Sequence, residues 1–374
     1  MLNFSKTKVL FIYLLLIITV FFAFLNFQRE NIIIDKKVNL GLDLQGGSYL
    51  LLEIDNVPLI KERIQNKAIP LKKLLRDNNI IYENFSVNSN KIIFNTNQNN
   101  IDKFEKLFFT KKNNIANLYI DKYKSHELDL IISENKLTIL FSKFGLLTIN
   151  NSALNQSIEI VRRRIDDLGT KEPTILQRGD KRILVELPGI KDPERIKELL
   201  GKTAQLHFRL VSDKLSEFGV DKLTSESGEE LTVSKRIIFS GENLIDAQPR
   251  LDSQTNQPMV TFSLDRLGAQ KFGKTTSTNI GKRIAIVLDD KIISAPTIRE
   301  SILGGSGTIS GDFTFQDVTD LSLLLRSGAL PTPLNIVEER TVGPDLGEDS
   351  IKSGAISLIV GFLLVIFFMI YKYK

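Results

Sequence analysis

The sequence has no cysteine and only two histidines, His126 and His207, among its 374 residues. The lack of cysteine excludes a disulfide framework, a thiol nucleophile and thiolate metal sites. Two histidines far apart in the chain are poor material for a His-rich metal centre or a His-based triad. We therefore expect no metal site and no cysteine- or histidine-based catalysis. With no other catalytic constellation in the sequence, we expect no enzyme activity, no catalytic residues and no cofactor.

The rest of the composition is that of an ordinary globular protein, with 42% hydrophobic and 25% charged residues. Widespread disorder is not expected from such a balance. At about 150 residues per domain, the length allows two or three domains. The net charge of +5 permits contact with anionic lipid or nucleic acid without selecting either. Because no stretch interleaves aromatic and basic residues, we expect no nucleic-acid partner.

Uncharged runs lie near both ends of the chain. The first, Val9 to Leu25, has 17 residues, and it extends over roughly 26 Å, just enough to cross a bilayer core. Lys6 and Lys8 precede it, which favours a cytoplasmic tip over 1–8. A cleaved signal peptide is the alternative, but no small-residue cleavage site follows the run. We predict an uncleaved transmembrane helix over 9–27.

The second run, Ala355 to Ile370, is followed by tyrosine and lysine, which suit the headgroup region. We predict a second transmembrane helix over 354–371 and a cytoplasmic end at 372–374. With both tips inside, residues 28–353 would lie across the membrane. An oxidising surrounding there fits a chain without cysteine.

A stripe of small residues marks the second predicted helix, where Ser353, Ser357 and Gly361 recur every four residues. Such a stripe lets another membrane helix approach closely. Small residues are also common in membrane helices for no specific reason. The stripe is therefore a candidate packing face.

Between the two runs, strand-like and helix-like patterns alternate and predict an α+β fold. Residues 40–125 read as strand, helix, hairpin, helix and a last strand near 115–123. Residues 136–212 repeat this βαββαβ order, which is the split-βαβ or ferredoxin-like pattern. We predict a base over 28–212 built from two ferredoxin-like units.

A smaller inserted head is predicted over 213–311, and it begins with a polar stretch over 213–234 that contains several glycines and serines. A glycine-rich run closes it, and the polar stretch and this run are candidate hinges for the head because glycine adopts conformations closed to other residues. A return to the base is predicted over 312–353, with Thr314 as an N-cap. In the second base unit, Asp192 is likewise predicted to cap a helix that begins at Pro193. The glycines of the hinge run are Gly304, Gly305, Gly307 and Gly311.

The sequence from Gly268 to Thr275 matches the phosphate-loop pattern of nucleotide-binding proteins. The spacing of apolar residues instead predicts a helix capped by Asp265, which would contain the supposed loop. We favour the helix over nucleotide binding.

Three consecutive arginines, Arg162 to Arg164, lie in a predicted amphipathic helix. At about 100° per residue their side chains fan around the axis instead of forming one edge that could hold a phosphate. We therefore expect a solvated face.

Several longer signatures occur in a fixed order and closely resemble the SecD family, subunits of the bacterial Sec protein-export apparatus. The first is LGLDLQGG, with Gly41, Asp43, Gln45, Gly46 and Gly47 in the turn. The others are VELPG over 185–189, with Glu186, Pro188 and Gly189, and then GKTAQ (201–205), GKRIAIVLDD (281–290), ISAPTI (293–298), GGSG (304–307), LRSGALP (325–331) and EERTVGP (338–344).

The resemblance implies a protein of the bacterial inner membrane with a periplasmic base and a mobile head. This region would engage an emerging unfolded preprotein and assist translocation driven by the proton-motive force. SecF, the SecYEG channel, YajC and YidC are the implied partners. Tight-turn geometry alone could explain the glycine signatures.

One departure from the family concerns its later helices. The family has six transmembrane helices, and its proton-coupling carboxylate and arginine lie beyond the second. We interpret the sequence as the N-terminal part of such a subunit. The alternative functions are a porter-type domain of a resistance-nodulation-division transporter for lipids or small molecules, and a membrane scaffold or sensor without a transport role.

Overall fold

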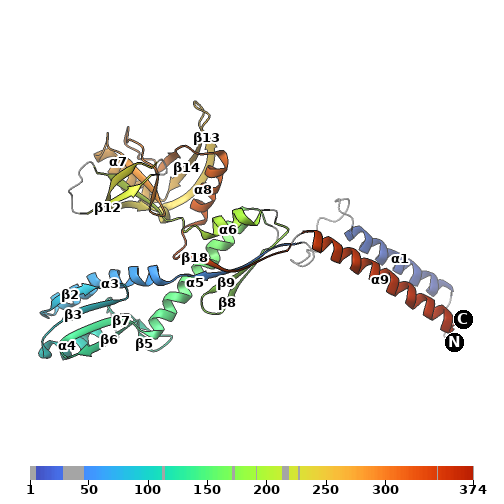
Figure 1. Ribbon diagram of the computed structural model, residues 1–374, viewed down its shortest axis with the longest axis horizontal. Helices are drawn as coiled ribbons and strands as arrows, with labels where there is room; N and C mark the ends of the chain where they lie inside the picture. The colour runs from blue at the N-terminus through green and yellow to red at the C-terminus, as the bar shows by residue number, and fades with distance from the viewer. Residues whose placement is uncertain are drawn as a thin grey trace. The chain divides into compact units, whose positions relative to one another are not determined.

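The computed structural model is a mixed α/β structure with several sheets (Figure 1). Its contacts divide the chain into two compact units, one formed by Met1–Gly47 with Val342–Lys374 and the other by Ser48–Thr341. The structure describes residues 6–27, 46–111, 114–170, 173–190, 192–212, 219–225, 228–342 and 344–373.

The first unit contains two helices, α1 (Lys6–Phe27) and α9 (Pro344–Tyr373). Within α9, the stretch Lys352–Lys372 is long and apolar enough to cross a membrane. The apolar stretch of α1, Leu10–Phe21, is shorter. The described residues therefore contain one candidate membrane span by length and composition.

The small-residue stripe lies on the exposed surface of α9. The hydroxyl of Ser357 donates to the carbonyl of Ser353 at 2.8 Å, which satisfies it within the helix. A methyl group added at Gly361 would meet nothing within 4 Å. Packing of this stripe against another helix stays a prediction.

The second unit begins with a four-stranded sheet in the order β18-β1-β9-β8. Helix α5 precedes the β8–β9 hairpin, and α6 follows it. The bounds are β1 Gly47–Ile54, α5 Lys143–Asp167, β8 Thr174–Arg178, β9 Arg182–Pro188, α6 Pro193–Gly201 and β18 Leu334–Val342.

Between β1 and α5 the chain forms a second sheet in the order β2-β3-β7-β6, with antiparallel pairs. One continuous hydrophobic core joins both sheets and the helices α3, α4 and α5. The bounds are α3 Val57–Asp77, β2 Glu83–Val87, β3 Lys91–Asn95, α4 Gln98–Phe108, β4 Tyr119–Ile120, β5 Ser125–His126, β6 Leu128–Ser133 and β7 Lys136–Phe141.

These two sheets combine the predicted strands differently from the two predicted βαββαβ units. Strand β1, expected in the first unit, pairs with β9 of the second, and β7 pairs with β3. Most of the strand expected near 115–123 is loop, with only Tyr119–Ile120 paired. Periodicity along the chain identifies a strand and its buried face, but it does not choose the partner strand.

The head contains a five-stranded sheet, β11-β12-β10-β15-β16, and a three-stranded sheet, β13-β14-β17. Helices α7 and α8 complete it. The bounds are β10 Leu206–Val211, β11 Val220–Thr224, β12 Glu230–Ser240, η1 Gly241–Asn243, β13 Leu244–Leu251, β14 Pro258–Leu264, α7 Arg266–Thr278, β15 Ile284–Leu288, β16 Lys291–Ser294, β17 Ser306–Ser310 and α8 Phe315–Ser327.

The hydrophobic core of the head extends beyond the predicted limits of 213–311. Phe208 of β10 stacks on Phe239 of β12, and Val318 and Leu321 of α8 are buried in the same cluster. Helix α8 therefore packs as part of the head, although we expected it in the return to the base. The chain enters the head after α6 and leaves it after α8.

Three predicted helix caps are confirmed. The side chains of Asp192, Asp265 and Thr314 each accept a hydrogen bond from the backbone N–H three residues further on. At α8 the cap is reciprocal, because Asp317 also accepts from the backbone of Thr314. These caps fix where α6, α7 and α8 begin.

Candidate functional site

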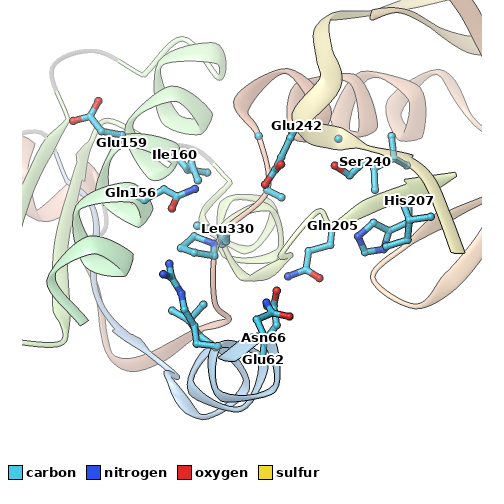
Figure 2. Close-up of a pocket in the computed structure, with 18 of the residues that line it drawn as sticks. Glu62, Asn66, Gln156, Glu159, Ile160, Gln205, His207, Ser240, Glu242 and Leu330 are labelled. Carbon is cyan, nitrogen blue, oxygen red and sulfur yellow. The ribbon is translucent and has the colours of Figure 1, made fainter. Parts of the chain in front are cut away.

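A cleft with a volume of about 1080 Å³ lies between the base and the head. Figure 2 shows side chains converging on it from α3, from α5 and from the start of the head. Both charged and apolar groups line it. They include Leu59, Glu62, Arg63, Asn66, Lys67, Ile115, Leu118, Gln156, Glu159, Ile160, Arg163, Gln205, His207, Ile237, Ser240, Glu242 and Leu330.

The base side of the cleft is fixed by polar contacts between distant segments. At the start of α3, the Asn56 amide donates to Asn150 Oδ1 of α5 at 2.6 Å. Lys67 of α3 forms an ion pair with Glu127 at 2.5 Å, and both side chains are largely buried. A shielded pair of this kind holds its geometry better than an exposed one. These contacts tie α3 to α5 and to the 114–127 segment.

Two asparagines hold the loop that reaches the cleft. The Asn114 amide donates to the carbonyls of Leu107 and Phe108 at the end of α4, at 3.0 and 2.7 Å. The fully buried Asn117 donates to the carbonyl of Leu128 at 3.1 Å and accepts from its N–H at 2.8 Å. The loop is thus held by side chains in place of a strand ladder, which explains why strand periodicity failed to describe it.

This loop carries two exposed apolar side chains. Ile115 is 72% exposed and Leu118 is 51% exposed, and both line the cleft. Ile237 of β12 is 41% exposed on the head side. Exposed apolar groups gathered in a cleft with a polar rim mark an interaction site more often than scattered ones do.

The head side of the cleft presents polar groups from β10, β12 and η1. Gln205, His207, Ser240 and Glu242 lie on this side in Figure 2. Burial and, second, the nearby Arg209 guanidinium lower the pKa of His207 below its ordinary value. His207 is therefore neutral at neutral pH.

Arg164 behaves differently from the solvated arginine that we expected. It is fully buried, and all of its hydrogen-bond acceptors among the described residues are backbone carbonyls. Burial lowers the pKa of Arg164 to about 10, so it keeps its charge at neutral pH. A signal for this burial was present, because Arg164 follows Ile160 by four positions and Val161 by three, on the apolar face of α5.

Asp289 organises the same junction from the head. Its carboxylate accepts from the Thr203 hydroxyl, from the Ala204 N–H at 3.0 Å and from the Gln205 N–H at 2.9 Å. Asp289 and Asp290 have φ of 48° and 63° in the turn between β15 and β16, as expected for a hairpin turn. The first of the two aspartates therefore binds the chain where it enters the head.

The predicted signature residues lie away from the cleft lining. Gly46 and Gly47 are buried with φ of 70° and 138°, which only glycine adopts without strain. Gly41, Asp43 and Gln45 lie outside the described residues. Glu186 and Pro188 end strand β9, and Gly189 follows with φ of 69°.

The glycine-rich run predicted as a hinge is largely a paired strand. Gly307 pairs with Phe262 across β14 and β17, and a methyl group there would lie 2.5 Å from the Phe262 ring. Gly305 has φ of 69° and would place a methyl group 2.6 Å from Ala269. Close packing inside the head accounts for these glycines, as it does for Gly311 against Phe313. A methyl group at Gly304 would meet nothing within 4 Å.

The phosphate-loop motif lies inside helix α7, as the apolar spacing predicts. Gly273 follows α7's buried Phe272, and Thr276 is buried with its hydroxyl bonded to helix carbonyls. A helical backbone donates its N–H groups to its own preceding turn and cannot wrap a phosphate with them. Among the described residues no group of three or more His, Asp or Glu side chains is placed to hold a metal ion.

Models of known protein families match three segments of this chain. Residues 32–56 match the SecD/SecF GG motif, 154–213 match the N-terminal part of the P1 domain of protein translocase subunit SecDF, and 217–332 match the SecDF P1 head subdomain. The class is thus a membrane translocase component with a P1-type base and head.

Individual relatives narrow the class. The protein translocase subunit SecD of Rickettsia felis is 40% identical over 386 aligned positions, covering 99% of this chain and 72% of the relative. SecD of Acetobacter pasteurianus is 40% identical, covering 90% and 66%. The chain belongs to the SecD family of protein translocase subunits.

Solved structures include a relative that is similar over most of this chain. A SecDF crystal structure in a super-membrane-facing form has a TM-score of 0.51 and 25% identity. The match covers 96% of this chain and 38% of that one. The chain therefore spans well under half of that longer protein.

Proposed function

We propose that the cleft between base and head holds a segment of an unfolded preprotein during export. Exposed Ile115 and Leu118 carry this proposal. Their loop is fixed by buried asparagines, so the apolar side chains are presented to the cleft at little further cost in conformational entropy. An extended polypeptide offers apolar side chains and unpaired backbone groups, and the cleft offers apolar and polar partners for both.

The fold behind this proposal is a split-βαβ module with two insertions. Strand β1, helix α5, strands β8 and β9, helix α6 and strand β18 follow the βαββαβ order in sequence. The β2–β7 sheet is inserted after β1 and the head after α6. We propose that the base is ferredoxin-like in this sense, with its strands drawn from both predicted units and from the predicted return segment.

The proposed topology has α1 and α9 as two transmembrane helices in the bacterial inner membrane. Both ends of the chain would be cytoplasmic, and residues of about 28–353 periplasmic. The lysines outside each apolar run support this orientation. In that position the cleft meets preprotein after it has crossed the membrane.

The proposed partners are those of the family: SecF, the SecYEG channel, YajC and YidC. Translocation would draw on the proton-motive force, and this chain would contribute grip without breaking a covalent bond. The mixture of apolar and polar residues that line the cleft supports a binding role.

Site-specific photocrosslinking tests the proposal. A benzophenone amino acid would replace Ile115 or Ile237 in the full chain, reconstituted with the Sec channel and an arrested radiolabelled preprotein. Adducts with preprotein are expected from both cleft positions and not from Asn88, which is exposed in the β2–β3 turn. Equal labelling from all three positions, or adducts with lipid alone, would contradict the proposal and favour a porter.

A matched pair of double variants sharpens that test. Ile115→Ser with Leu118→Ser should lower the adduct yield from position 237, because the apolar contact is removed without touching the head. Ile131→Ser with Ile132→Ser, on the exposed strand β6, removes similar apolar area outside the cleft lining. That control should leave the yield unchanged.

A further inference from the structure

Both connections between base and head pass a single guanidinium. Arg164 Nη1 donates to the carbonyls of Leu199 and Lys202 at 2.7 and 2.5 Å, where the chain leaves α6. Nη2 reaches the carbonyl of Thr203 at 3.4 Å and that of Gly328 at 3.3 Å, where the chain leaves α8. One side chain of the base thus contacts the way into the head and the way out.

The electrostatics of the site suit this arrangement. The carbonyls at a helix C-terminus carry the negative end of the helix dipole and lack partners within the helix. Arg164 meets the C-terminal ends of two helices, α6 of the base and α8 of the head. Its positive charge is therefore balanced by two helix ends, although its Nε finds no acceptor among the described residues.

The entry connection is held in a strained conformation. Ala204 has φ of 58°, a region that residues with a Cβ seldom adopt. Asp289 binds Thr203, Ala204 and Gln205 from the head, and the N–H of Leu330 donates to the carbonyl of Thr203 at 2.8 Å. These bonds oppose the relaxation of Ala204, so loosening them allows the entry connection to change its backbone conformation.

The base and the head also meet through other contacts, since α8 packs directly against α5. A small apolar cluster at the junction contains Leu199, Ala204 and Leu324. Two ion pairs also join α8 to the base, Arg195–Asp320 and Arg326–Asp167, and their side chains are between 21% and 42% exposed. Ion pairs at such exposure contribute about 0–1 kcal/mol each.

We propose that Arg164 is the positioning residue that sets the angle of the head on the base, and with it the opening of the cleft. It ties the last turns of α6 and α8 and both connections to one point on α5. Its role as a control of the binding cleft rests on the proposed function, whereas its role in fixing the angle does not.

Spin labels measure the angle directly, because the chain has no cysteine of its own. Ser89→Cys in the base and Ser253→Cys in the head, both exposed, receive nitroxide labels in the full chain in detergent. Pulsed electron resonance then gives the distribution of distances between them. Arg164→Met removes the donors and keeps most of the side-chain length, and Arg164→Lys keeps the charge with a single donor group.

The parent is expected to show one narrow distribution. R164M should shift or broaden it, R164K should lie between the two, and R162M, on the exposed neighbour, should match the parent. Unchanged distributions in R164M and R164K would overturn the inference, whatever the preprotein crosslinks show. If R164M does not fold by circular dichroism, R164K and Asp289→Asn decide, and both must shift the distribution.

Discussion

The two sides of the cleft are held in different ways. In the loop on the base side, Asn114 and Asn117 bond to backbone groups within about a dozen positions in the chain, so this loop has little freedom. The helices behind the loop are tied by the longer-range contacts of Asn56 and Lys67. On the head side, Arg164 and Asp289 bond to segments that are tens of residues away. The first arrangement fixes the shape of the loop on the base side of the cleft, and the second joins the head to the base. We therefore expect the loop on the base side to keep its shape if the angle of the head changes.

The largest effect is expected in the loop on the base side from Asn117→Ala. The substitution leaves the buried N–H and carbonyl of Leu128 without partners, which should lower the free energy of unfolding by about 2–4 kcal/mol. Urea unfolding followed by circular dichroism measures it. Asn99→Ala, at an exposed position in α4, should change the same quantity by less than about 0.5 kcal/mol.

The substitution Gly307→Ala tests whether close packing or backbone flexibility requires glycine in this run of the head. A methyl group against the Phe262 ring should destabilise the protein by about 1–3 kcal/mol through overpacking. Gly304→Ala, where a methyl group meets open space, should leave the stability nearly unchanged. Thermal unfolding followed by circular dichroism measures both variants. Equal effects at both glycines would mean that chain flexibility, and not packing, selects glycine in this run.

Asp289→Asn tests the long-range tie on the head side. An amide tolerates the positive φ but cannot accept from all three donors on residues 203–205, so a loss of about 1–2 kcal/mol is expected. Asp290→Asn makes the same chemical change one position later, where the side chain is exposed, and it should have little effect. Similar losses from both variants would remove Asp289 from the account of the junction.

The smallest effect is expected when the two histidines are substituted, and it concerns the pH dependence of the free energy of unfolding. Burial is the main cause that lowers the pKa of both His126 in the base and His207 in the head. The unfolded chain then takes up protons near pH 6.5, before the folded protein does, so the free energy of unfolding falls as pH drops below that value. His126→Gln and His207→Gln should each flatten this acid-side slope in urea titrations, and a slope unchanged in the double variant would exclude the histidines as its cause.

The sequence predicted the local features with physical signatures. Capping residues located the starts of α6, α7 and α8, because a polar side chain before an apolar periodic run has few other uses. Apolar spacing also identified α7 correctly despite its phosphate-loop letters. Strand partners were predicted poorly, because β1 pairs with strands far along the chain. A period-two pattern shows which face of a strand is buried, but it does not show which strand it pairs with.

The site itself was less accessible to sequence reasoning. Asn114 and Asn117 resemble ordinary loop residues until their backbone partners are known. Arg164 was predicted on a solvated face together with Arg162 and Arg163, although its spacing from Ile160 and Val161 places it on the apolar face of α5. A position-by-position reading of that face would have separated Arg164 from Arg162 and Arg163. Its carbonyl partners, which come from the ends of two helices, could not have been found that way.

The hydrogen bond between Leu330 and Thr203 brings the two ends of the head to within one backbone contact of each other. A domain whose termini meet in this way can be inserted or removed without stretching the host, because the host chain only has to bridge a short gap. The head could thus be exchanged for that of a relative, or deleted, with only a short linker to close the gap in the base.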